Sequence, residues 1–368
     1  MFGLGRRRPL RALQVEVTSR CTRQCSICPR SALSEQWLQG DLSQQHWQRL
    51  EQDLTTTEHV HLQGWGEPLL YPELRRLVRA AKRKSCSVSI TTNADLLTAA
   101  CSWMVTEQVD WVTVSVAGDT QTHGLLRDAS ELGRVLEAAA EVARRARQSR
   151  STTRVQLSYL LTRSNAAQLP ALVLRAAAAD IPEVFVTHVD CTPTPHLLAQ
   201  AAFAAPDFES ELVRYVSEAE ALARRHRVRF RAPALQPQSL LTCALNPLRF
   251  AFVAWDGRVG PCVNLLLPVH GSLPRCTPDS SLSVAPLLYG HLDDHGLAEL
   301  LDGATRGAFI SPFQQRLQAE RQFTSALQLS SGAEALRQLE KADRQRSLAL
   351  DKAPFPQACQ GCHKALGW

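Results

Sequence analysis

The sequence predicts an α/β protein built on a parallel β-sheet. From Ala12 to about Val189, six runs rich in β-branched residues alternate with amphipathic helical stretches, an order typical of a parallel sheet. Such a sheet is either doubly wound or curled into an open barrel. In both arrangements ligands bind at the carboxyl ends of the strands.

The expected strands share a high content of Val, Ile, Thr and aromatic residues, and their sequences are ALQVEVT, EHVHLQ, SVSITT, WVTVSV, RVQLSYLL and EVFVTHV. The helical stretches between them have apolar residues three and four positions apart, as in YPELRRLVRAAKRK, EAAAEVARRAR and AQLPALVLRAAAA. The first strand is expected to end at Val17 and Thr18, where a cysteine-rich loop begins. That position at a strand end favours a functional role for the loop.

The chain is expected to divide into a first domain over residues 1–195, a helical connector over 196–240 and a smaller C-terminal domain over 241–368. The connector follows from the Pro- and Ala-rich segment CTPTPHLLAQAAFAAP. In the last domain, LRFAFVAWDGRVGPCV predicts a β-hairpin around an Asp-Gly turn. Residues 313–351 are rich in Gln, Arg, Leu and Ala, which indicates a helical insertion.

The composition is that of an ordinary soluble enzyme, with 368 residues, 45% hydrophobic and 21% charged. No apolar run approaches the ~20 residues needed to cross a bilayer, and MFGLGRRRPLR lacks the apolar core of a secretory signal. We therefore expect a cytoplasmic protein without a membrane partner. The net charge of +6 is spread over helix-like segments such as EVARRARQSR, so no nucleic-acid partner is expected.

Three of the 11 cysteines stand together in RCTRQCSICPR. Cytosolic thiols are kept reduced, and three thiols cannot all pair with one another, so metal ligation is the better explanation. A loop with three sulfurs can bind a cubane cluster through three of its four irons and leave the fourth iron open. A structural zinc would need a fourth ligand, and the next histidine, His46, lies 18 residues downstream in an expected helix.

Cys21, Cys25 and Cys28 form a C-x3-C-x2-C motif that closely resembles the signature of radical S-adenosylmethionine (SAM) enzymes. The resemblance implies a partial (β/α)6 TIM-like barrel and a 4Fe-4S cluster bound by these three cysteines. In that family the open iron chelates the amino and carboxylate groups of SAM. One-electron cleavage then gives methionine and a 5'-deoxyadenosyl radical, which removes a hydrogen atom from the substrate.

Three further segments follow the order of the same family. LQGWGEPLLYP resembles its G-G-E-P region, which implies SAM contacts at Gly64, Trp65, Gly66, Glu67 and Pro68. ITTNA, with Asn93, and VSVAGDTQTHGLLR, with Ser115, His123 and Arg127, resemble segments that line the ribose and carboxylate of SAM. Ala117 stands where the family often has an acidic residue, so Ser115 is expected to make the ribose contact. The resemblance covers roughly residues 12–190.

Four other cysteines are patterned: Cys243 precedes the expected hairpin, Cys262 ends it, and Cys359 and Cys362 form C-x2-C. Four sulfurs would complete a closed site for zinc or for an iron-sulfur cluster, and His363 offers zinc a further ligand. The remaining cysteines, expected to be buried or inert thiols, are Cys86, Cys101, Cys191 and Cys276. Cys276 is also considered as a substitute ligand in an expected loop.

The hairpin with its G-x4-C spacing, the YGHLDDHGLAELLDG segment and the closing C-x2-C resemble the C-terminal auxiliary-cluster domain of radical SAM enzymes, called SPASM, or its shortened twitch form. The resemblance implies a small α+β domain with one auxiliary 4Fe-4S cluster bound by the four patterned cysteines. A fully ligated cluster has no iron free for substrate, so its expected role is electron transfer. A flavodoxin or ferredoxin is implied as the electron donor.

The segment THVDCTPTP after the sixth expected strand should face the cavity of an open barrel. Asp190 or His188 could then take a substrate proton, or Cys191 could return a hydrogen atom to a substrate radical. Alternatively, each caps local backbone groups. Tyr159 on the fifth strand is either a cavity residue or part of the core.

These features predict a radical SAM oxidoreductase of the SPASM/twitch group that acts on a peptide or a small polar metabolite. The alternative is a non-catalytic zinc-binding interaction module on an α/β scaffold. Iron content distinguishes the two.

Overall fold

One ten-stranded sheet organises the fold, and the computed structural model describes residues 8–329 and 333–368. The order of strands in the sheet is β12-β9-β8-β1-β2-β3-β4-β5-β6-β7. The six predicted strands are adjacent and parallel, and they are β1 (Leu10–Val15), β2 (Thr57–Leu62), β3 (Ser87–Thr92), β4 (Trp111–Val116), β5 (Arg154–Leu161) and β6 (Glu183–His188). The predicted parallel α/β architecture is confirmed.

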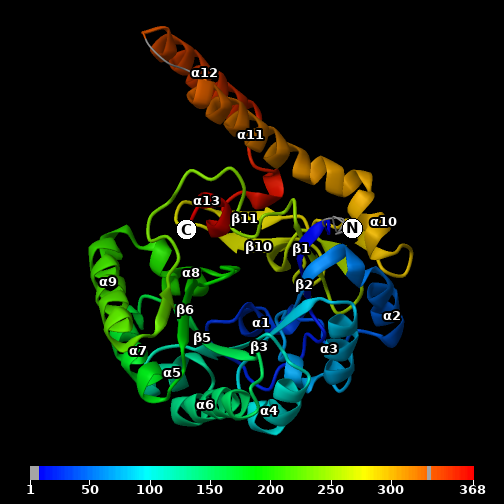
Figure 1. Cartoon of the computed structure of the whole chain (residues 1–368), viewed down its shortest axis with the longest axis vertical. Helices are drawn as coiled ribbons and strands as arrows, with labels where there is room; N and C mark the ends of the chain where they lie inside the picture. The colour runs from blue at the N-terminus through cyan, green and yellow to red at the C-terminus, as the bar shows by residue number, and fades with distance from the viewer. Residues whose placement is uncertain (1–7, 330–332) are drawn as a thin grey trace.

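Helices form an outer arc around the curled sheet, as Figure 1 shows. They are α2 (Gln44–Asp53), α3 (Leu74–Arg83), α4 (Leu97–Thr106), α5 (Thr120–Leu126), α6 (Leu132–Gln148), α7 (Leu169–Ala178) and α9 (Glu209–His226). Alternate strand residues such as Val60, Ile90 and Val112 are fully buried, as expected for positions that pack beneath helices. The intervening positions are polar, and His61 Nδ1 lies 2.6 Å from Ser89 Oγ on the next strand.

The C-terminal region continues the barrel sheet, which the sequence did not reveal. β8 (Phe250–Val253) pairs in parallel with β1, and β9 (Arg258–Gly260) returns antiparallel to β8 around the predicted turn at Gly257. The other strands are β7 (Arg229–Arg231), parallel to β6, β12 (Gly290–His291), antiparallel to β9, and the separate hairpin of β10 (Leu273–Cys276) and β11 (Ser281–Val284). The region expected as a connector thus also supplies a strand of the barrel.

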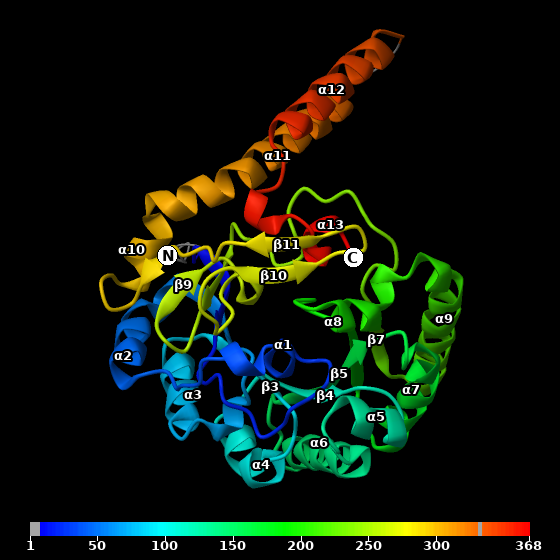
Figure 2. The same cartoon turned by 180° about the vertical axis from the view of Figure 1, so that it is seen from behind.

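Two long helices, α11 (Ala304–Leu329) and α12 (Ala333–Lys352), pack against each other and project away from the barrel (Figures 1 and 2). The predicted insertion is helical but begins earlier than expected, at Ala304. The short helices are α1 (Pro29–Ala32), α8 (Pro195–Gln200), α10 (Leu297–Asp302) and α13 (His363–Leu366). Turns of 3-10 helix lie at Ser34–Gln36, Leu54–Thr56, Pro68–Leu70, Ala166–Gln168, Ala202–Ala204, Pro206–Phe208, Val263–Leu265 and Gln357–Cys359.

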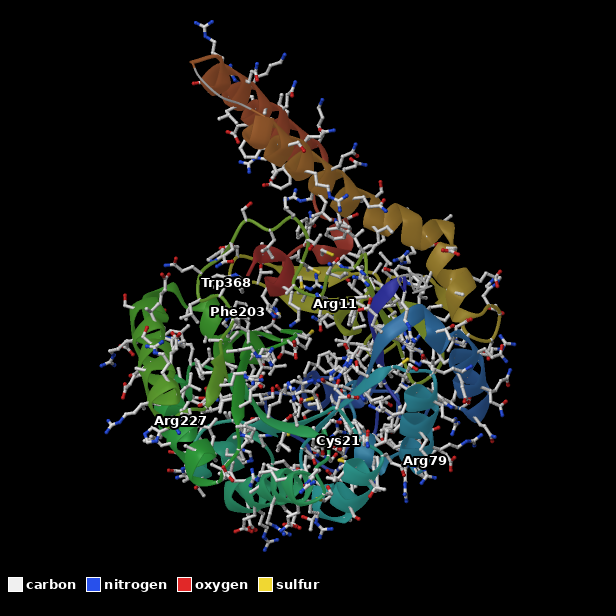
Figure 3. All side chains as sticks on the ribbon, in the orientation of Figure 1. Arg11, Cys21, Arg79, Phe203, Arg227 and Trp368 are labelled. Carbon is white, nitrogen blue, oxygen red and sulfur yellow. The ribbon has the colours of Figure 1, made fainter. Side chains whose placement is uncertain are left out.

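The C-terminal residues dock on the segment that follows β6. The ring centroids of Trp368 and Phe203 are 5.8 Å apart, and His363 stacks on Phe203 at 5.0 Å; Figure 3 labels Phe203 and Trp368 side by side. The end of the chain therefore packs against the segment that follows β6. Within residues 8–329 and 333–368, no helix has the length and apolarity needed to span a membrane.

Candidate active site

The loop after β1 brings three thiols together. Cys28 lies immediately before α1, and its N–H donates to the carbonyl of Cys25 at 3.1 Å. Burial, together with smaller contributions from the thiolates of Cys25 and Cys21, raises the pKa of the Cys28 thiol to about 12. The three side chains therefore lie close enough to interact electrostatically, and metal ligation would require them to release their protons.

The loops after β3 and β4 anchor this cysteine loop. Arg23 Nε donates to Asp95 Oδ1 at 2.9 Å, and the N–H of Gln24 donates to Asp128 Oδ2 at 2.9 Å. Figure 3 labels Cys21 inside the ring of helices. Neighbouring strand ends thus fix the conformation of the loop.

Two glycines after β2 permit the close backbone approach that the site requires. A Cβ atom on Gly66 would lie 2.2 Å from the carbonyl oxygen of Thr18 and 2.5 Å from that of Arg20. A Cβ on Gly64 would lie 2.2 Å from Cγ of Glu16. Because backbone atoms cannot move aside as a flexible side chain can, Gly66 is the more restricted position.

Trp65 connects this glycine segment with the C-terminal region. Its Nε1 donates to the carbonyl of Val263 at 3.4 Å, directly after Cys262, and its ring lies edge-on to Trp37 at 6.4 Å. Pro68 is buried and begins a turn of 3-10 helix. The segment therefore contacts both cysteine-bearing parts of the molecule.

Glu67 lies buried at the carboxyl ends of β2 and β3. Its Oε1 accepts hydrogen bonds from the Leu69 N–H at 3.0 Å and from Thr92 Oγ1 at 2.8 Å, and its Oε2 accepts one from the Asn93 N–H at 2.7 Å. Burial raises the pKa of Glu67 to about 7. The side chain of Asn93 donates to Cys21 Sγ at 3.7 Å. Asn93 therefore joins the carboxylate to the cysteine loop.

Ser115 and Arg127 follow on the next strand and helix. Ser115 on β4 pairs with Ser158 on β5, and Arg127 caps α5. The guanidinium of Arg127 has no hydrogen-bond or ion-pair partner in the described part of the chain. His123 is fully buried, accepts the Ala117 N–H at 3.1 Å and has its pKa lowered to about 3 by burial. His123 is therefore a buried residue that orders the backbone after β4.

The four patterned cysteines converge from three separate segments. Burial raises the pKa of the Cys262 thiol well above its ordinary value, and the thiolates of Cys362, Cys359 and Cys243 raise it further. The Cys362 N–H donates to the carbonyl of Cys359 at 3.2 Å, which closes the C-terminal turn. We call these four residues the second cysteine group.

The spacing of the sulfur atoms bears on which metal could bind. Among the described residues, three candidate ligand atoms lie within 4.8 Å of one another only at His46, His291 and Asp293. In any set of three cysteines, at least one pair of sulfur atoms is therefore more than 4.8 Å apart. Tetrahedral zinc, with Zn–S bonds of ~2.3 Å, would hold its sulfurs about 3.8 Å apart. A cubane cluster separates them further, because each sulfur binds a different iron.

Two basic residues that sequence reasoning missed support the second cysteine group. Arg275 is buried on β10, and its Nη1 donates to the carbonyls of Ala358 at 3.0 Å and Gln360 at 2.6 Å. Lys364 Nζ forms an ion pair with Asp190 Oδ1 at 2.7 Å. In the sequence, the only indication of this role is that both residues lie close to a cysteine.

The three residues predicted to act on the substrate differ in their surroundings. His188 is buried, its Nε2 bonds to the carbonyl of Ala234 at 2.9 Å, and burial lowers its pKa. Asp190 is partly exposed and paired with Lys364. His188 is thus engaged by the backbone, whereas Asp190 keeps an accessible carboxylate.

Cys191 lies between the two cysteine groups. Burial, together with smaller contributions from the thiolates of Cys362 in one group and Cys28 in the other, raises the pKa of its thiol to about 12. The structure therefore brings one more thiol into the region that both groups border.

Other candidates are core residues. Tyr159 is fully buried and donates to the carbonyl of Asn165 at 2.7 Å, so it does not line a cavity. Cys276 was expected in a loop, but it ends β10 and its N–H donates to the carbonyl of Thr192 at 2.7 Å. The expectation of a loop was wrong because the hairpin partner of β10 lies in a weakly patterned segment. Cys86 and Cys101 are buried, as expected.

Comparison with known proteins adds to this geometry. Residues 15–176, from the end of β1 into α7, match the family model of the Radical SAM superfamily. This part of the chain is therefore similar to the radical SAM superfamily.

Relatives and solved structures resemble this chain over most of its length. It is 22% identical over 266 residues to the tungsten-containing aldehyde ferredoxin oxidoreductase cofactor-modifying protein of Pyrococcus furiosus, covering 70% of this chain and 72% of that protein. SuiB of Streptococcus suis bound to S-adenosylmethionine aligns with a TM-score of 0.54 at 16% identity, over 70% of this chain and 61% of SuiB. Native anSMEcpe with bound AdoMet and Kp18Cys peptide aligns with a TM-score of 0.57 at 15% identity, over 82% of this chain and 83% of that protein. These structural likenesses show the fold, and this chain spans less than two thirds of the length of SuiB.

The residues at the strand ends fit the groups that the family binds. The first loop offers three thiols, Glu67 offers a buried carboxylate with a raised pKa, and Arg127 offers a guanidinium without a partner in the described residues. Thiolates are ligands for iron. A carboxylate can accept hydrogen bonds from an ammonium group, and a guanidinium can pair with a carboxylate. The donor set is therefore chemically suited to a cluster together with SAM.

Proposed function

We propose that this chain is a radical SAM oxidoreductase that abstracts a hydrogen atom from a peptide or a small polar metabolite. The observation that carries the proposal is the convergence of three thiols with a buried carboxylate, which Asn93 joins to the cysteine loop. A 4Fe-4S cluster bound by Cys21, Cys25 and Cys28 would supply reductive cleavage of SAM to methionine and a 5'-deoxyadenosyl radical.

The residues around the loop have distinct proposed roles in binding SAM. Glu67, held by the Asn93 N–H at 2.7 Å, presents its carboxylate to the methionine amino group. Arg127 pairs with the methionine carboxylate, and Ser115 contacts the ribose. Gly64 and Gly66 allow the backbone of the segment to approach the ligand.

On the substrate side, Asp190 is the stronger candidate for accepting a proton, because the Nε2 atom of His188 already bonds to a carbonyl. Lys364 orients the Asp190 carboxylate through the 2.7 Å ion pair. A hydrogen atom returned by Cys191 would instead give a product with the same oxidation state as the substrate. The oxidised product and the product of hydrogen return differ in oxidation state by two electrons, so the mass of the product distinguishes them.

The second cysteine group is proposed to bind an auxiliary 4Fe-4S cluster through Cys243, Cys262, Cys359 and Cys362. The resemblance of these segments to the auxiliary-cluster domain supports this assignment over zinc. With all four irons ligated, its proposed role is to accept the electron left on the substrate radical. A flavodoxin or ferredoxin is the proposed external electron donor.

A peptide substrate is favoured by two of the structural relatives. SuiB has been solved bound to precursor peptide SuiA with a TM-score of 0.56, and anSMEcpe with bound Kp18Cys peptide with a TM-score of 0.57. The projecting pair α11 and α12 offers additional surface that a peptide could contact.

The test is anaerobic reconstitution with iron and sulfide, followed by incubation of the reduced enzyme with SAM and candidate peptides or metabolites. We expect about eight irons per chain from two 4Fe-4S clusters, absorbance near about 400 nm and substrate-dependent formation of 5'-deoxyadenosine. A colourless protein with zinc and no iron would refute the proposal and support a zinc-binding interaction module.

A further inference from the structure

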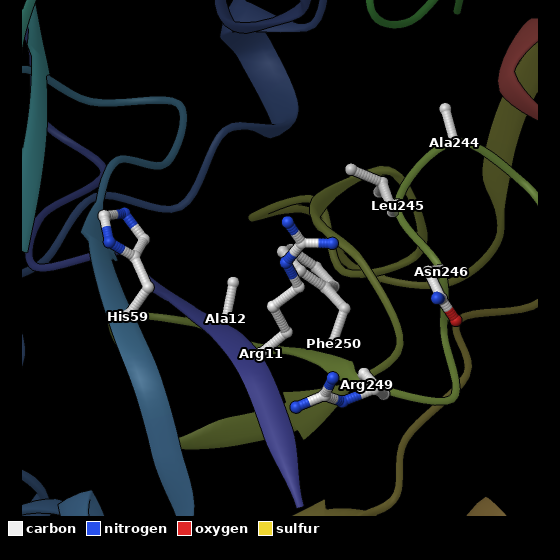
Figure 4. Close-up of a pocket in the computed structure, with 8 residues that line it drawn as sticks. All are labelled: Arg11, Ala12, His59, Ala244, Leu245, Asn246, Arg249 and Phe250. Carbon is white, nitrogen blue, oxygen red and sulfur yellow. The ribbon is translucent and has the colours of Figure 1, made fainter. Parts of the chain in front are cut away.

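A pocket of about 320 Å³ lies at the start of β1, at the opposite end of the strand from the cysteine loop. Arg11, His59 and Phe250 line it from three adjacent strands, and Asn246 lines it from the loop that follows Cys243 (Figure 4). None of these residues has a role in the function proposed above.

Hydrogen bonds fix the backbone at the edge of this pocket. The N–H groups of Arg11 and Ala12 both donate to the carbonyl of Arg249, at 2.7 and 3.2 Å. Arg11 and Ala12 both line the pocket. Figure 4 shows the Arg11 guanidinium extending towards the loop that contains Leu245.

The charge of the pocket comes from Arg11. Arg249 is paired with Glu58 at 2.6 Å, which offsets its charge. The ring nitrogens of His59 lie 2.7 Å from Ser87 Oγ and 2.6 Å from Ser89 Oγ, and burial lowers its pKa to about 4, so it is neutral at pH 7. Among the described residues the Arg11 guanidinium has no hydrogen-bond or ion-pair partner.

Asn246 adds a second polar group to the wall of the pocket. Its backbone is left-handed, with φ of 52°, and its N–H donates to the Cys243 carbonyl at 2.9 Å. Its side-chain amide has no partner within residues 8–329 and 333–368. A guanidinium and an amide in the lining of one pocket offer the donors that a small anion needs.

We propose that this pocket binds a compact anion, a carboxylate or phosphate group, with Arg11 as its counter-charge. β1 has six residues, which at about 3.3 Å each span about 20 Å, so the bound anion is distinct from the carboxylate of SAM at the far end. An anion held here lies against the loop that follows Cys243 of the second cysteine group. The inference does not depend on radical chemistry, because Arg11 and Asn246 are outside both cysteine groups.

The experiment is calorimetric titration of the reconstituted protein, without SAM, with inorganic phosphate in one arm and succinate in the other. We expect saturable binding of at least one anion, and the tighter of the two identifies the ligand class. Arg11→Gln should weaken that binding by about tenfold or more, the loss of one charge-assisted hydrogen-bonded pair. Asn246→Asp, which adds a negative charge to the wall, should weaken it comparably.

The matched control is Arg225→Gln on α9, which removes the same charge from an exposed arginine outside the pocket. It should change the affinity by less than about twofold, because exposed charges more than a Debye length apart are screened. Iron content and thermal midpoint should be the same for Arg11→Gln as for the unmodified protein. The inference is overturned by the absence of saturable binding in both arms, or by equal losses in Arg11→Gln and Arg225→Gln. Because no 5'-deoxyadenosine is measured, an inactive enzyme that still binds the anion would refute only the proposed function.

Discussion

The two cysteine groups are assembled in opposite ways. Cys21, Cys25 and Cys28 stand on one continuous loop whose backbone bonds to itself, as in the 3.1 Å bond from Cys28 to Cys25. The second cysteine group combines a residue before β8, a residue after β9 and a C-terminal turn. The first group therefore depends on local structure, and the second depends on the whole C-terminal fold.

The supports of the two groups differ in the same way. The first loop is anchored by Asp95 and Asp128 on the adjacent loops of the barrel. The second group depends on distant contacts, from Arg275 on β10 and from Asp190 after β6 to Lys364. Damage to distant packing should therefore affect the second group before the first.

The largest expected effect is that of Cys25→Ala compared with Cys359→Ala. Without the second thiol the first loop lacks the three sulfurs that a site-differentiated cluster needs, so SAM cleavage should fall by about 100-fold or more. Cys359→Ala should keep some SAM cleavage that is uncoupled from product, because the first loop is intact. Chromatographic measurement of 5'-deoxyadenosine tests both. The buried Cys101→Ala is the control and should retain activity; 5'-deoxyadenosine from Cys25→Ala would contradict the assignment of the loop.

Asp190→Asn tests the link between the second group and the substrate side. Loss of a proton acceptor should lower product formation by about tenfold to 1,000-fold while SAM cleavage persists. Lys364→Met is the companion variant, since it removes only the 2.7 Å partner and should reduce product less. Product and 5'-deoxyadenosine are quantified in the same reaction. Equal losses of both in Asp190→Asn would argue for a structural role instead.

Gly66→Ala should destabilise the fold around the first group. Its Cβ would meet the backbone oxygen of Thr18 at 2.2 Å, and forcing such overlap costs about 1–3 kcal/mol in the free energy of unfolding. Gly133→Ala is the matched control on α6, where nothing lies within 4 Å of the new Cβ. It should instead stabilise the protein by about 0.5–1 kcal/mol through helix propensity. Anaerobic urea unfolding measures both, and a neutral Gly66→Ala would show that the segment can move.

The smallest effect concerns pH and Glu16, which is buried beneath the glycine segment. Burial raises the pKa of Glu16 from 4.5 to about 8, so the folded state binds more protons than the unfolded state between these values. The free energy of unfolding should therefore fall as pH rises through this window. Glu16→Gln cannot titrate and should show a flatter dependence, by about 1 kcal/mol between pH 7 and 8. Parallel pH profiles for the two proteins would contradict the raised pKa.

The sequence patterns predicted the elements that are determined by residues close together in the chain. Each of the six parallel strands has its own β-branched run, and the β8–β9 hairpin has its Asp-Gly turn, so these elements were predictable one by one. The first cysteine loop was predictable for the same reason. Its three thiols lie within eight residues of one another.

Long-range pairings were not predictable in this way. Nothing in residues 250–253 indicates that they hydrogen-bond to β1 rather than form a separate domain. The contact of the Arg11 N–H with the Arg249 carbonyl exists only because the chain that leads into β8 lies beside β1, so Arg11 carried no signal in the sequence. The pair formed by Asp190 and Lys364 joins positions far apart in the chain and depends on how the C-terminal turn docks.

The pairing of β8 with β1 also has a consequence for how the protein is synthesised. β1 is bordered by β2 on one side and β8 on the other, so on the ribosome its second edge stays open until Val253 has emerged. An open strand edge is a template for pairing with another chain. Fragments or stalled nascent chains that end before Phe250 should therefore self-associate through the strand that leads into the first cysteine loop, and a chaperone would have to shield that edge during translation.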